Sequence, residues 1–458
     1  MAQGVSGAYL GTFFHTPVYG QMEYLKDALI EVDKDGVITR VALPADADYA
    51  QLVAGYRQAG TLTELPAGCV GLPGFVDIHV HSCQWPQSAL ALDEPLYLWL
   101  QEKTFPLESK FADLDFARTV YADLVDQLFA RGATTVVYLG SAHLEATVEL
   151  ARICVDKGQR ALVGKTVMDD PEANPSYYRD ASAASAVADT ETLIHEVEGM
   201  QHDCPQGVWP VITPRFIPSC TDEVLKGLGD LAARYDCYVQ THCNEGQWEH
   251  DTVLARFGKE DPYALQDFGL LRDHSIMAHG CFLTPEEGEL FERLGVAVAH
   301  CPMSNPYFGS SVAPVRRLRE QGVRMGLGTD ISGGYSPNLY ESIRQAVMSS
   351  RQLETGVNAL VPEAERGGVP DSRISVVQAF WLATKGGGEA LGLPVGDFEP
   401  GMAFDLQVID TKRRWSDLTG FGVFDEPQDQ LARILYLSNP ENIRQVYAQG
   451  RLVCNKDA

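Results

Sequence analysis

Eight short apolar runs recur through the middle of the chain, and stretches with helical spacing lie between several of them. The first run covers residues 75–81 and follows a Pro-Gly turn. The other seven cover residues 134–139, 161–167, 208–216, 237–242, 275–281, 297–301 and 325–330. Strands that alternate with helices form parallel sheets, so eight such units predict a (β/α)8 barrel.

Two of the segments between these runs carry clear helix signals. Phe116, Val120, Leu124 and Leu128 keep a four-residue spacing, which places them on one apolar stripe. A second helix is expected to begin after residue 284, where an N-cap Thr precedes a Pro at the first helical position and a Glu at the third. Gly295 is expected to end that helix.

Both ends of the chain have the pattern of β structure. Residues 28–32 and 37–41 flank a turn that contains glycine, which predicts a β-hairpin. Residues 403–410 and 443–453 are also strand-like. We therefore predict a small composite β-sandwich domain made from residues 1–70 and 394–458, and a barrel domain over residues 71–393.

The composition narrows the choice of partners and compartment. The 458 residues carry a formal net charge of −26, which argues against nucleic acid or an anionic membrane as a partner. Residues 1–10 lack a basic flank and an apolar core, so no signal peptide is expected, and no apolar run is long enough to span a bilayer. Ten cysteines without a C-x-x-C pair indicate a reducing cytoplasmic setting. The base rate for soluble oligomers favours a homodimer.

Polar residues gather at the carboxyl ends of the predicted barrel strands. His79 and His81 alternate along the first strand and therefore point to the same side. His242, His279 and Asp330 end the fifth, sixth and eighth strands. A (β/α)8 barrel brings these strand ends together at one mouth. Imidazole and carboxylate groups bind divalent metals such as zinc, so the pattern predicts a metal site.

Other candidate ligands near the strand ends are interpreted differently. His300 ends the seventh strand, where it either lines the mouth or packs the turn that follows. Four cysteines also lie near strand ends and are expected to be small packing residues, since histidines are available as ligands. They are Cys83, Cys243, Cys281 and Cys301.

The motifs at the strand ends resemble those of the amidohydrolase superfamily between Leu72 and about Leu393. They are Pro-Gly-Phe-Val-Asp-x-His-x-His from residue 73, Thr-His at 241–242, Ala-His-Gly at 278–280, His-Cys-Pro-x-Ser-Asn at 300–305 and Gly-Leu-Gly-Thr-Asp at 326–330. Within that superfamily the chain resembles the guanine deaminase family, on residues 81–84, 103–106, 158–165, 213–216 and 328–336. That family usually reads Ser-Glu-Asn after the histidine of the fifth strand, and this chain has Asn-Glu-Gly at 244–246.

The resemblance implies a hydrolase that converts guanine to xanthine and ammonia with one zinc ion per chain. It implies that the metal ligands are His79, His81, His242 and Asp330. Asp330 is also placed to take a proton from the attacking water, and His279 to hydrogen-bond to that water. Glu245 would carry the proton to N3 of the base and then to the departing amine.

Three residues are expected to recognise the purine base. Arg215 offers a planar set of donors suited to O6 or N7, and Gln84 can both donate and accept on the same edge. Phe216 supplies an apolar face, although an ordinary core position fits it nearly as well. The pair of Arg215 and Gln84 argues against the alternative substrates 8-oxoguanine, cytosine, a pterin or a triazine.

Two further alternatives stay open at this point. Several superfamily members hold two metals bridged by a modified lysine, and Lys165 on the third strand keeps that arrangement possible. The second alternative is a non-catalytic scaffold protein with the same barrel. The complete set of metal ligands argues against this alternative.

Overall fold

A computed structural model describes residues 7–457 of the chain. We expect no signal peptide in residues 1–10, and the first six of these residues lie outside the described range. Among residues 7–457, no helix has both the length and the apolar character needed to cross a membrane. The described chain divides into two compact units: residues 7–76, 126–135 and 375–457 form one, and residues 77–125 and 136–374 form the other. Our predicted domain boundaries, at 70/71 and 393/394, stay a prediction.

The predicted barrel is confirmed as a nearly closed sheet of parallel strands. Its strand order is β14-β13-β12-β11-β10-β8-β7-β6, with the short strand β9 paired to β10. The strands are β6 (Phe75–His81), β7 (Ala133–Leu139), β8 (Arg160–Gly164), β9 (Thr166–Val167), β10 (Val208–Pro214), β11 (Tyr238–Cys243), β12 (Ser275–His279), β13 (Ala297–His300) and β14 (Arg324–Leu327). Each of the eight predicted runs therefore overlaps a barrel strand.

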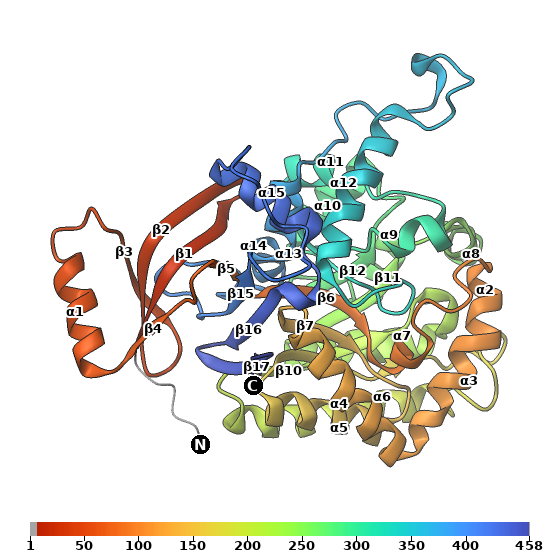
Figure 1. Cartoon of the computed structure of the whole chain (residues 1–458). Coiled ribbons are helices and arrows are strands. Elements are labelled where there is room, and N and C mark those ends of the chain that lie inside the picture. The colour runs from red at the N-terminus through yellow and green to blue at the C-terminus, as the bar shows by residue number, and fades with distance from the viewer. Residues whose placement is uncertain (1–6, 458) are drawn as a thin grey trace. The chain divides into compact units, whose positions relative to one another are not determined.

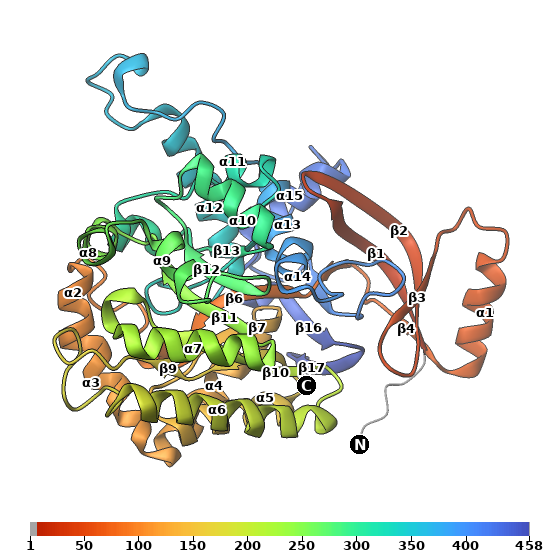
Figure 2. The same cartoon turned by 180° about the vertical axis from the view of Figure 1, so that it is seen from behind.

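Helices connect consecutive strands of the barrel, and α5, α6 and α7 run along its outside (Figures 1 and 2). The barrel helices are α4 (Leu114–Phe129), α5 (Leu144–Lys157), α6 (Ala183–Met200), α7 (Asp222–Tyr235), α8 (Gln247–Phe257), α9 (Asp261–Asp267), α10 (Pro285–Leu294), α11 (Val315–Glu320) and α12 (Leu339–Thr355). The short helices α2 (Leu96–Trp99) and α3 (Phe105–Glu108) precede α4. The predicted start and end of α10 are confirmed, with a capping box between Thr284 and Glu287 and a left-handed Gly295.

Contacts between the first strand and the segment that follows the last strand bring the two ends of the barrel sheet together. The backbone N–H of Asp330 donates to the carbonyl of His79 at 2.9 Å, and that of His81 donates to the carbonyl of Ile331 at 3.0 Å. Asp77 on β6 accepts from the backbone N–H and the hydroxyl of Thr329, at 3.0 and 2.6 Å. The segment after β14 is thereby fixed beside the two histidines of β6.

As predicted, segments from both chain ends build one β domain, and its strands form one mixed sheet. Its order is β17-β16-β15-β5-β1-β2-β3, and β4 pairs with β1 in parallel. The strands are β1 (Gly7–Val18), β2 (Gln21–Val32), β3 (Ile38–Ala42), β4 (Leu62–Glu64), β5 (Cys69–Pro73), β15 (Leu406–Asp410), β16 (Ile443–Ala448) and β17 (Arg451–Asn455). Helices α1 (Tyr49–Ala59), α13 (Val376–Ala383), α14 (Lys385–Leu391) and α15 (Pro427–Leu437) complete this unit.

The terminal hairpins differ in how well the sequence predicted them. β2 and β3 form the expected antiparallel hairpin. The run 443–453, which we interpreted as one strand-like segment, is instead a hairpin of β16 and β17. Gln449 and Gly450 make its turn, with φ of 49° and 74°. Two successive residues with positive φ fit the tight turns that join twisted antiparallel strands.

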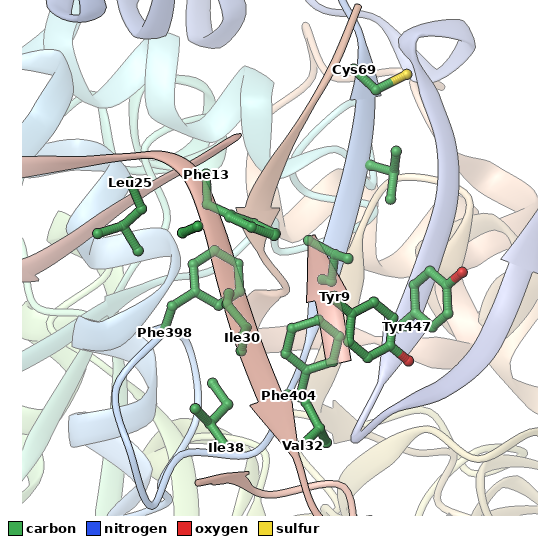
Figure 3. Close-up of a cluster of buried hydrophobic side chains, with 13 residues drawn as sticks. Tyr9, Phe13, Leu25, Ile30, Val32, Ile38, Cys69, Phe398, Phe404 and Tyr447 are labelled. Atoms are coloured by element: carbon green, nitrogen blue, oxygen red, sulfur yellow. The ribbon is translucent and has the colours of Figure 1, made fainter. Parts of the chain in front are cut away.

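Aromatic side chains dominate one core of the terminal sheet, and Figure 3 shows this cluster. Tyr9 lies between Phe404 and Tyr447, with ring centroids 4.1 and 5.5 Å away. Phe13 meets Phe398 edge-on at 5.4 Å. Strands β1 and β16 and the segment between α14 and β15 contribute these rings, so their burial joins segments that are far apart in the sequence.

A buried ion network in the same unit leads to a stability prediction. The carboxylate of Asp397 is fully buried, contacts His15 and accepts from Lys385 at 2.8 Å. We expect Asp397→Asn to lower the free energy of unfolding by about 3–5 kcal/mol, because it removes the buried carboxylate that pairs with the partly buried Lys385 ammonium and contacts His15. Chemical denaturation at pH 7 would measure this.

The pH dependence and a surface control sharpen that test. Burial opposes ionisation of Asp397, but the contacts with His15 and Lys385 outweigh it and hold its pKa below the usual value. The stabilisation is therefore complete above the unfolded pKa of about 3.9 and is lost as the pH falls below it. Glu399→Gln, at a half-exposed position that also pairs with Lys385, should cost less than about 1 kcal/mol. Equal costs for both variants would contradict the prediction.

Candidate active site

The structure brings together the four residues predicted to bind a metal. The ligand atoms of His79, His81, His242 and Asp330 all lie within 4.8 Å of one another, and the four residues are buried. The Nε2 atoms of His81 and His242 are 3.0 Å apart, and Oδ1 of Asp330 is 3.3 Å and 3.4 Å from Nε2 of His79 and His81. A tetrahedral site with ligand distances of about 2.0–2.1 Å has edges of about 3.3–3.4 Å. The spacing therefore fits a bound metal ion.

The protonation states also suit metal binding. Burial lowers the pKa of His79, and it lowers the pKa values of His81 and His242 further, so all three rings are neutral at pH 7. Nδ1 of His242 donates to the backbone carbonyl of Arg215 at 2.5 Å, which leaves its Nε2 lone pair free. Nε2 of His79 is buried without a hydrogen-bond partner, as expected for an atom that binds a metal.

Asp330 supplies the negative charge at this centre. Burial acts to raise its pKa, but the contact with His79 and the neighbouring imidazoles outweigh that effect and hold the pKa well below the usual value. Its backbone is left-handed, with φ of 50°, and that of His279 is also left-handed, with φ of 76°. Non-glycine residues in this region cost about 1–3 kcal/mol each and concentrate at functional sites.

The other residues considered as ligands are less suited. His79, His279, Cys301 and Asp330 form a second possible group, but burial raises the pKa of the Cys301 thiol well above its usual value, so it stays protonated. Lys165 is buried and its Nζ donates to Asp180 at 2.6 Å, so that amine already has a partner. Burial lowers the pKa of His300 to about 3, and His300 does not line the cavity beside the centre.

The predicted acid–base residues lie next to the four ligands. Oε1 of Glu245 is 3.7 Å from Nε2 of His279, and both side chains are buried. Burial raises the pKa of Glu245, with His279 opposing the shift. Nδ1 of His279 faces Oδ1 of Asn305 at 2.8 Å and is the donor in that bond. The motif at 300–305 contained Asn305, but we had assigned it no role.

Two carboxylates hold the loop that carries Glu245. Glu249 accepts from the backbone N–H of Glu245 at 2.8 Å, and Asp261 accepts from that of Asn244 at 3.0 Å. Asn244 is left-handed, with φ of 57°. The segment 244–246, where the chain departs from the usual family sequence, is therefore fixed by side chains from α8 and α9.

A cavity opens beside the four ligands and includes the predicted base contacts. His81, His242, Asp330 and Glu245 line one part of it, and Gln84, Arg215 and Phe216 line another. Sequence reasoning missed its remaining lining residues, which carry no polar motif: Leu96, Trp99, Leu100, Phe308 and Gly333. An apolar cavity with a few polar groups is the usual form of a small-molecule site.

Glu108 is the charged residue near this cavity that the sequence did not reveal. It lies at the end of α3 and is 1% exposed. Its carboxylate accepts from both terminal nitrogens of Arg215, at 2.8 and 3.2 Å, and from Nε2 of Gln84 at 2.9 Å. A single Glu in a short helix has no distinguishing pattern, so its role becomes visible only in three dimensions.

Comparison with known proteins agrees with this geometry. The model of the amidohydrolase family matches residues 70–453. The chain belongs to the amidohydrolase family. The family resemblance predicted from the strand-end motifs is thus confirmed.

This amidohydrolase has full-length relatives among guanine deaminases. It is 34% identical over 453 residues to the guanine deaminase of Mus musculus, covering 97% of this chain and 96% of that protein. It is 34% identical over 451 residues to a probable guanine deaminase of Schizosaccharomyces pombe, covering 97% and 83%. The structure of guanine deaminase from C. acetobutylicum with guanine bound in the active site shares 30% identity and a TM-score of 0.86, covering 98% of this chain and 100% of that one.

Proposed function

We propose that this amidohydrolase hydrolyses guanine at C2 to give xanthine and ammonia, with one zinc ion held by His79, His81, His242 and Asp330. The observation that carries the proposal is the cavity that connects Asp330 and Glu245 with Arg215 and Gln84. Groups suited to acid–base catalysis and groups that can hydrogen-bond to a purine base thus lie in one buried site. The guanine deaminases among its relatives support the same substrate.

The zinc ion, when bound, supplies a Lewis acid that lowers the pKa of a water molecule to about 7. Asp330, whose pKa is held low, is ready to accept a proton from the attacking water. Nε2 of His279 hydrogen-bonds to the attacking oxygen, because its Nδ1 donates to Asn305. Glu245, whose pKa burial raises, can deliver a proton to N3 and then to the leaving amine.

The base is oriented by other groups that line the same cavity. Arg215 donates to O6 or N7, and Gln84 contacts the same edge of the base. Phe216 offers an apolar face and lies near His242 and Trp248, with ring centroids 6.3 and 5.7 Å away. These contacts support the proposed roles of Gln84, Arg215 and Phe216 in binding the base.

Ammonia release from a panel of heterocycles tests the proposed substrate. The panel contains guanine, 8-oxoguanine, cytosine, a pterin and a triazine. We expect rapid release from guanine, with xanthine as the second product, and at least about 10²-fold slower release from the others. If the protein turns over another compound of the panel faster than guanine, the amidohydrolase reaction is retained but the proposed substrate is wrong. No turnover by metal-loaded protein would favour a scaffold role.

The metal content provides an independent prediction. We expect about one tightly bound zinc per chain, because one group of four ligands fits a tetrahedral ion and Lys165 is paired with Asp180. Elemental analysis of the purified protein measures this stoichiometry. Two zinc ions per chain, or full activity after complete removal of metal, would contradict the single-zinc assignment.

We also propose that the protein is a cytoplasmic homodimer that binds neither nucleic acid nor membranes. Ten free cysteines favour a reducing compartment, and the net charge of −26 disfavours phosphate-rich partners. A two-fold dimer is the commonest state of soluble oligomers. Light scattering of the purified protein would decide the oligomeric state, and a monomer would contradict the proposal.

A further inference from the structure

Glu108 connects the two polar residues that are proposed to read the base. Oε1 of Glu108 accepts from Nε2 of Gln84 at 2.9 Å and from Nη2 of Arg215 at 3.2 Å, while Oε2 accepts from Nη1 of Arg215 at 2.8 Å. All three side chains are at most 3% exposed. Gln84 and Arg215 line the cavity, and Glu108 lies behind them.

These contacts fix which atom of the Gln84 amide is available to a ligand. An ionised carboxylate only accepts hydrogen bonds, so the group facing Glu108 must be the NH2 group. From the other side, the backbone N–H of Ser332 donates to Oε1 of Gln84 at 3.3 Å, so the group facing Ser332 must be the oxygen. An amide oxygen has a second lone pair, and Gln84 therefore offers an acceptor to the cavity.

The same carboxylate orients the guanidinium of Arg215. Three contacts occupy N–H groups of Arg215, two with Glu108 and one from Nη1 to the sulfur of Met168 at 3.7 Å. A guanidinium carries five N–H donors, so donors remain for a ligand. Phe105 supports the group from one face, with the guanidinium carbon 5.1 Å from its ring centroid. Arg215 is thus held as a rigid donor.

We propose that Glu108 is a positioning residue that sets the hydrogen-bond polarity of base recognition, making Arg215 the donor and Oε1 of Gln84 the acceptor. This inference rests on the proposed function and deepens it. Guanine presents an O6 acceptor beside an N1–H donor, which complements that arrangement. A 6-aminopurine presents the reverse pattern, an amino donor beside an unprotonated N1, so both hydrogen bonds are lost with it.

The substrate pair guanine and 2,6-diaminopurine isolates this effect. Both carry an amino group at C2, so hydrolysis breaks the same C2–N bond, adds one water and releases one ammonia. They differ at the edge that Arg215 and Gln84 would read. The change in the ratio of their kcat/KM values from one variant to another therefore reports recognition of that edge, because the intrinsic reactivity of each base at C2 cancels in the comparison.

We expect the wild-type protein to prefer guanine by about 10⁴-fold, as sites built around substrate hydrogen bonds do. Glu108→Gln replaces a carboxylate, which can only accept hydrogen bonds, with an amide that can also donate. The amide of Gln84 can then rotate to the opposite orientation, and Arg215 loses its ion pair with residue 108. We expect the preference to fall by roughly 10–100-fold, the worth of a hydrogen bond to a charged group. Loss of fold or metal would reduce both kcat/KM values by the same factor and leave the ratio unchanged.

Three comparisons keep the test decisive. Glu102→Gln removes the same charge from an exposed site on the preceding segment, and it should keep wild-type activity and preference. Glu108→Asp keeps the charge but withdraws it by one methylene, so its preference should lie between those of the wild type and Glu108→Gln. Glu108→Asp also carries the test if Glu108→Gln does not fold, because it keeps a carboxylate beside Arg215.

The outcomes separate this inference from the proposed function. If folded, zinc-loaded Glu108→Gln prefers guanine over 2,6-diaminopurine as strongly as the wild type does, the role of Glu108 is wrong. Guanine turnover by the wild type is unaffected by that result. If Glu108→Asp is the variant that folds, a preference equal to that of the wild type overturns the role of Glu108 in the same way. Absence of guanine turnover by the zinc-loaded wild type overturns the proposed function itself.

Discussion

Adenine is expected to be turned over at least about 10⁴-fold more slowly than guanine in kcat/KM, which is the largest effect predicted here. Adenine places an amino donor where guanine places O6, so it faces the donors of Arg215 and leaves both groups unpaired. It also has no amino group at C2, so a tolerated pose presents nothing to hydrolyse beside Asp330 and Glu245. Ammonia release from each base at several concentrations measures the ratio. Comparable rates would show that the substrate assignment is wrong.

The same argument assigns a large effect to Arg215→Ala. Removing the donor should lower kcat/KM for guanine by about 10²–10³, the worth of a buried charged hydrogen bond, while zinc stays bound. The variant also leaves Glu108 buried without its cationic partner, which should lower the free energy of unfolding by about 3–5 kcal/mol. Kinetics must therefore be measured at a temperature where denaturation curves show the variant folded.

A surface pair gives the matched control for Arg215→Ala. Arg234 pairs with Glu191 at 2.8 Å on the outside of the molecule, where its side chain is 60% exposed. Arg234→Ala removes the same kind of ion pair from an exposed site, so kcat/KM and the free energy of unfolding should both stay close to the wild-type values. Normal guanine kinetics in Arg215→Ala would remove this residue from substrate recognition.

Glu245→Gln is expected to lower kcat by about 10²–10⁴, the usual contribution of a positioned acid–base group. The substitution keeps the size of the side chain and removes its ability to carry a proton. Zinc content should stay at the wild-type level, since Glu245 is not among the four ligands, and guanine should still bind. Glu289→Gln, on the exposed face of α10, provides a charge-matched control that should keep full activity. An unchanged kcat in Glu245→Gln would exclude Glu245 from proton transfer.

The barrel and its metal ligands were accessible from the sequence because both depend on repeating local patterns. The alternation of apolar runs and helices predicts parallel strands, and the barrel rule then places every strand end at one mouth. His79 and His81 share a face of β6 because strand side chains alternate, so their proximity needs no tertiary information. For His242 and Asp330, the apolar runs predict a position at a strand end, and the barrel rule converts that position into proximity.

Other features were not predicted. The turn at Gln449 and Gly450 divides a run that we interpreted as strand-like throughout, although a glycine between strand-like residues is a local turn signal. Lys165 suits a metal-bridging role from its strand alone, and its contact with Asp180 becomes visible only after the loop between them folds back. Glu249 and Asp261 were missed for the same reason, since they act on the backbone of residues that belong to a different element.

Sequence patterns were thus sufficient to predict the eight barrel strands and their alternation with helices, a β domain built from both chain ends, the candidate metal ligands and the family. These depend on periodicity, on local turn and cap signals, and on motifs at strand ends. Only the folded structure shows which hydrogen-bonding groups of Arg215 and Gln84 remain for a ligand. Glu108 lies on a separate helix and accepts hydrogen bonds from both side chains, so those donors are no longer available. Hydrogen-bond polarity depends on partners brought together by folding, and no spacing within one segment of the chain encodes it.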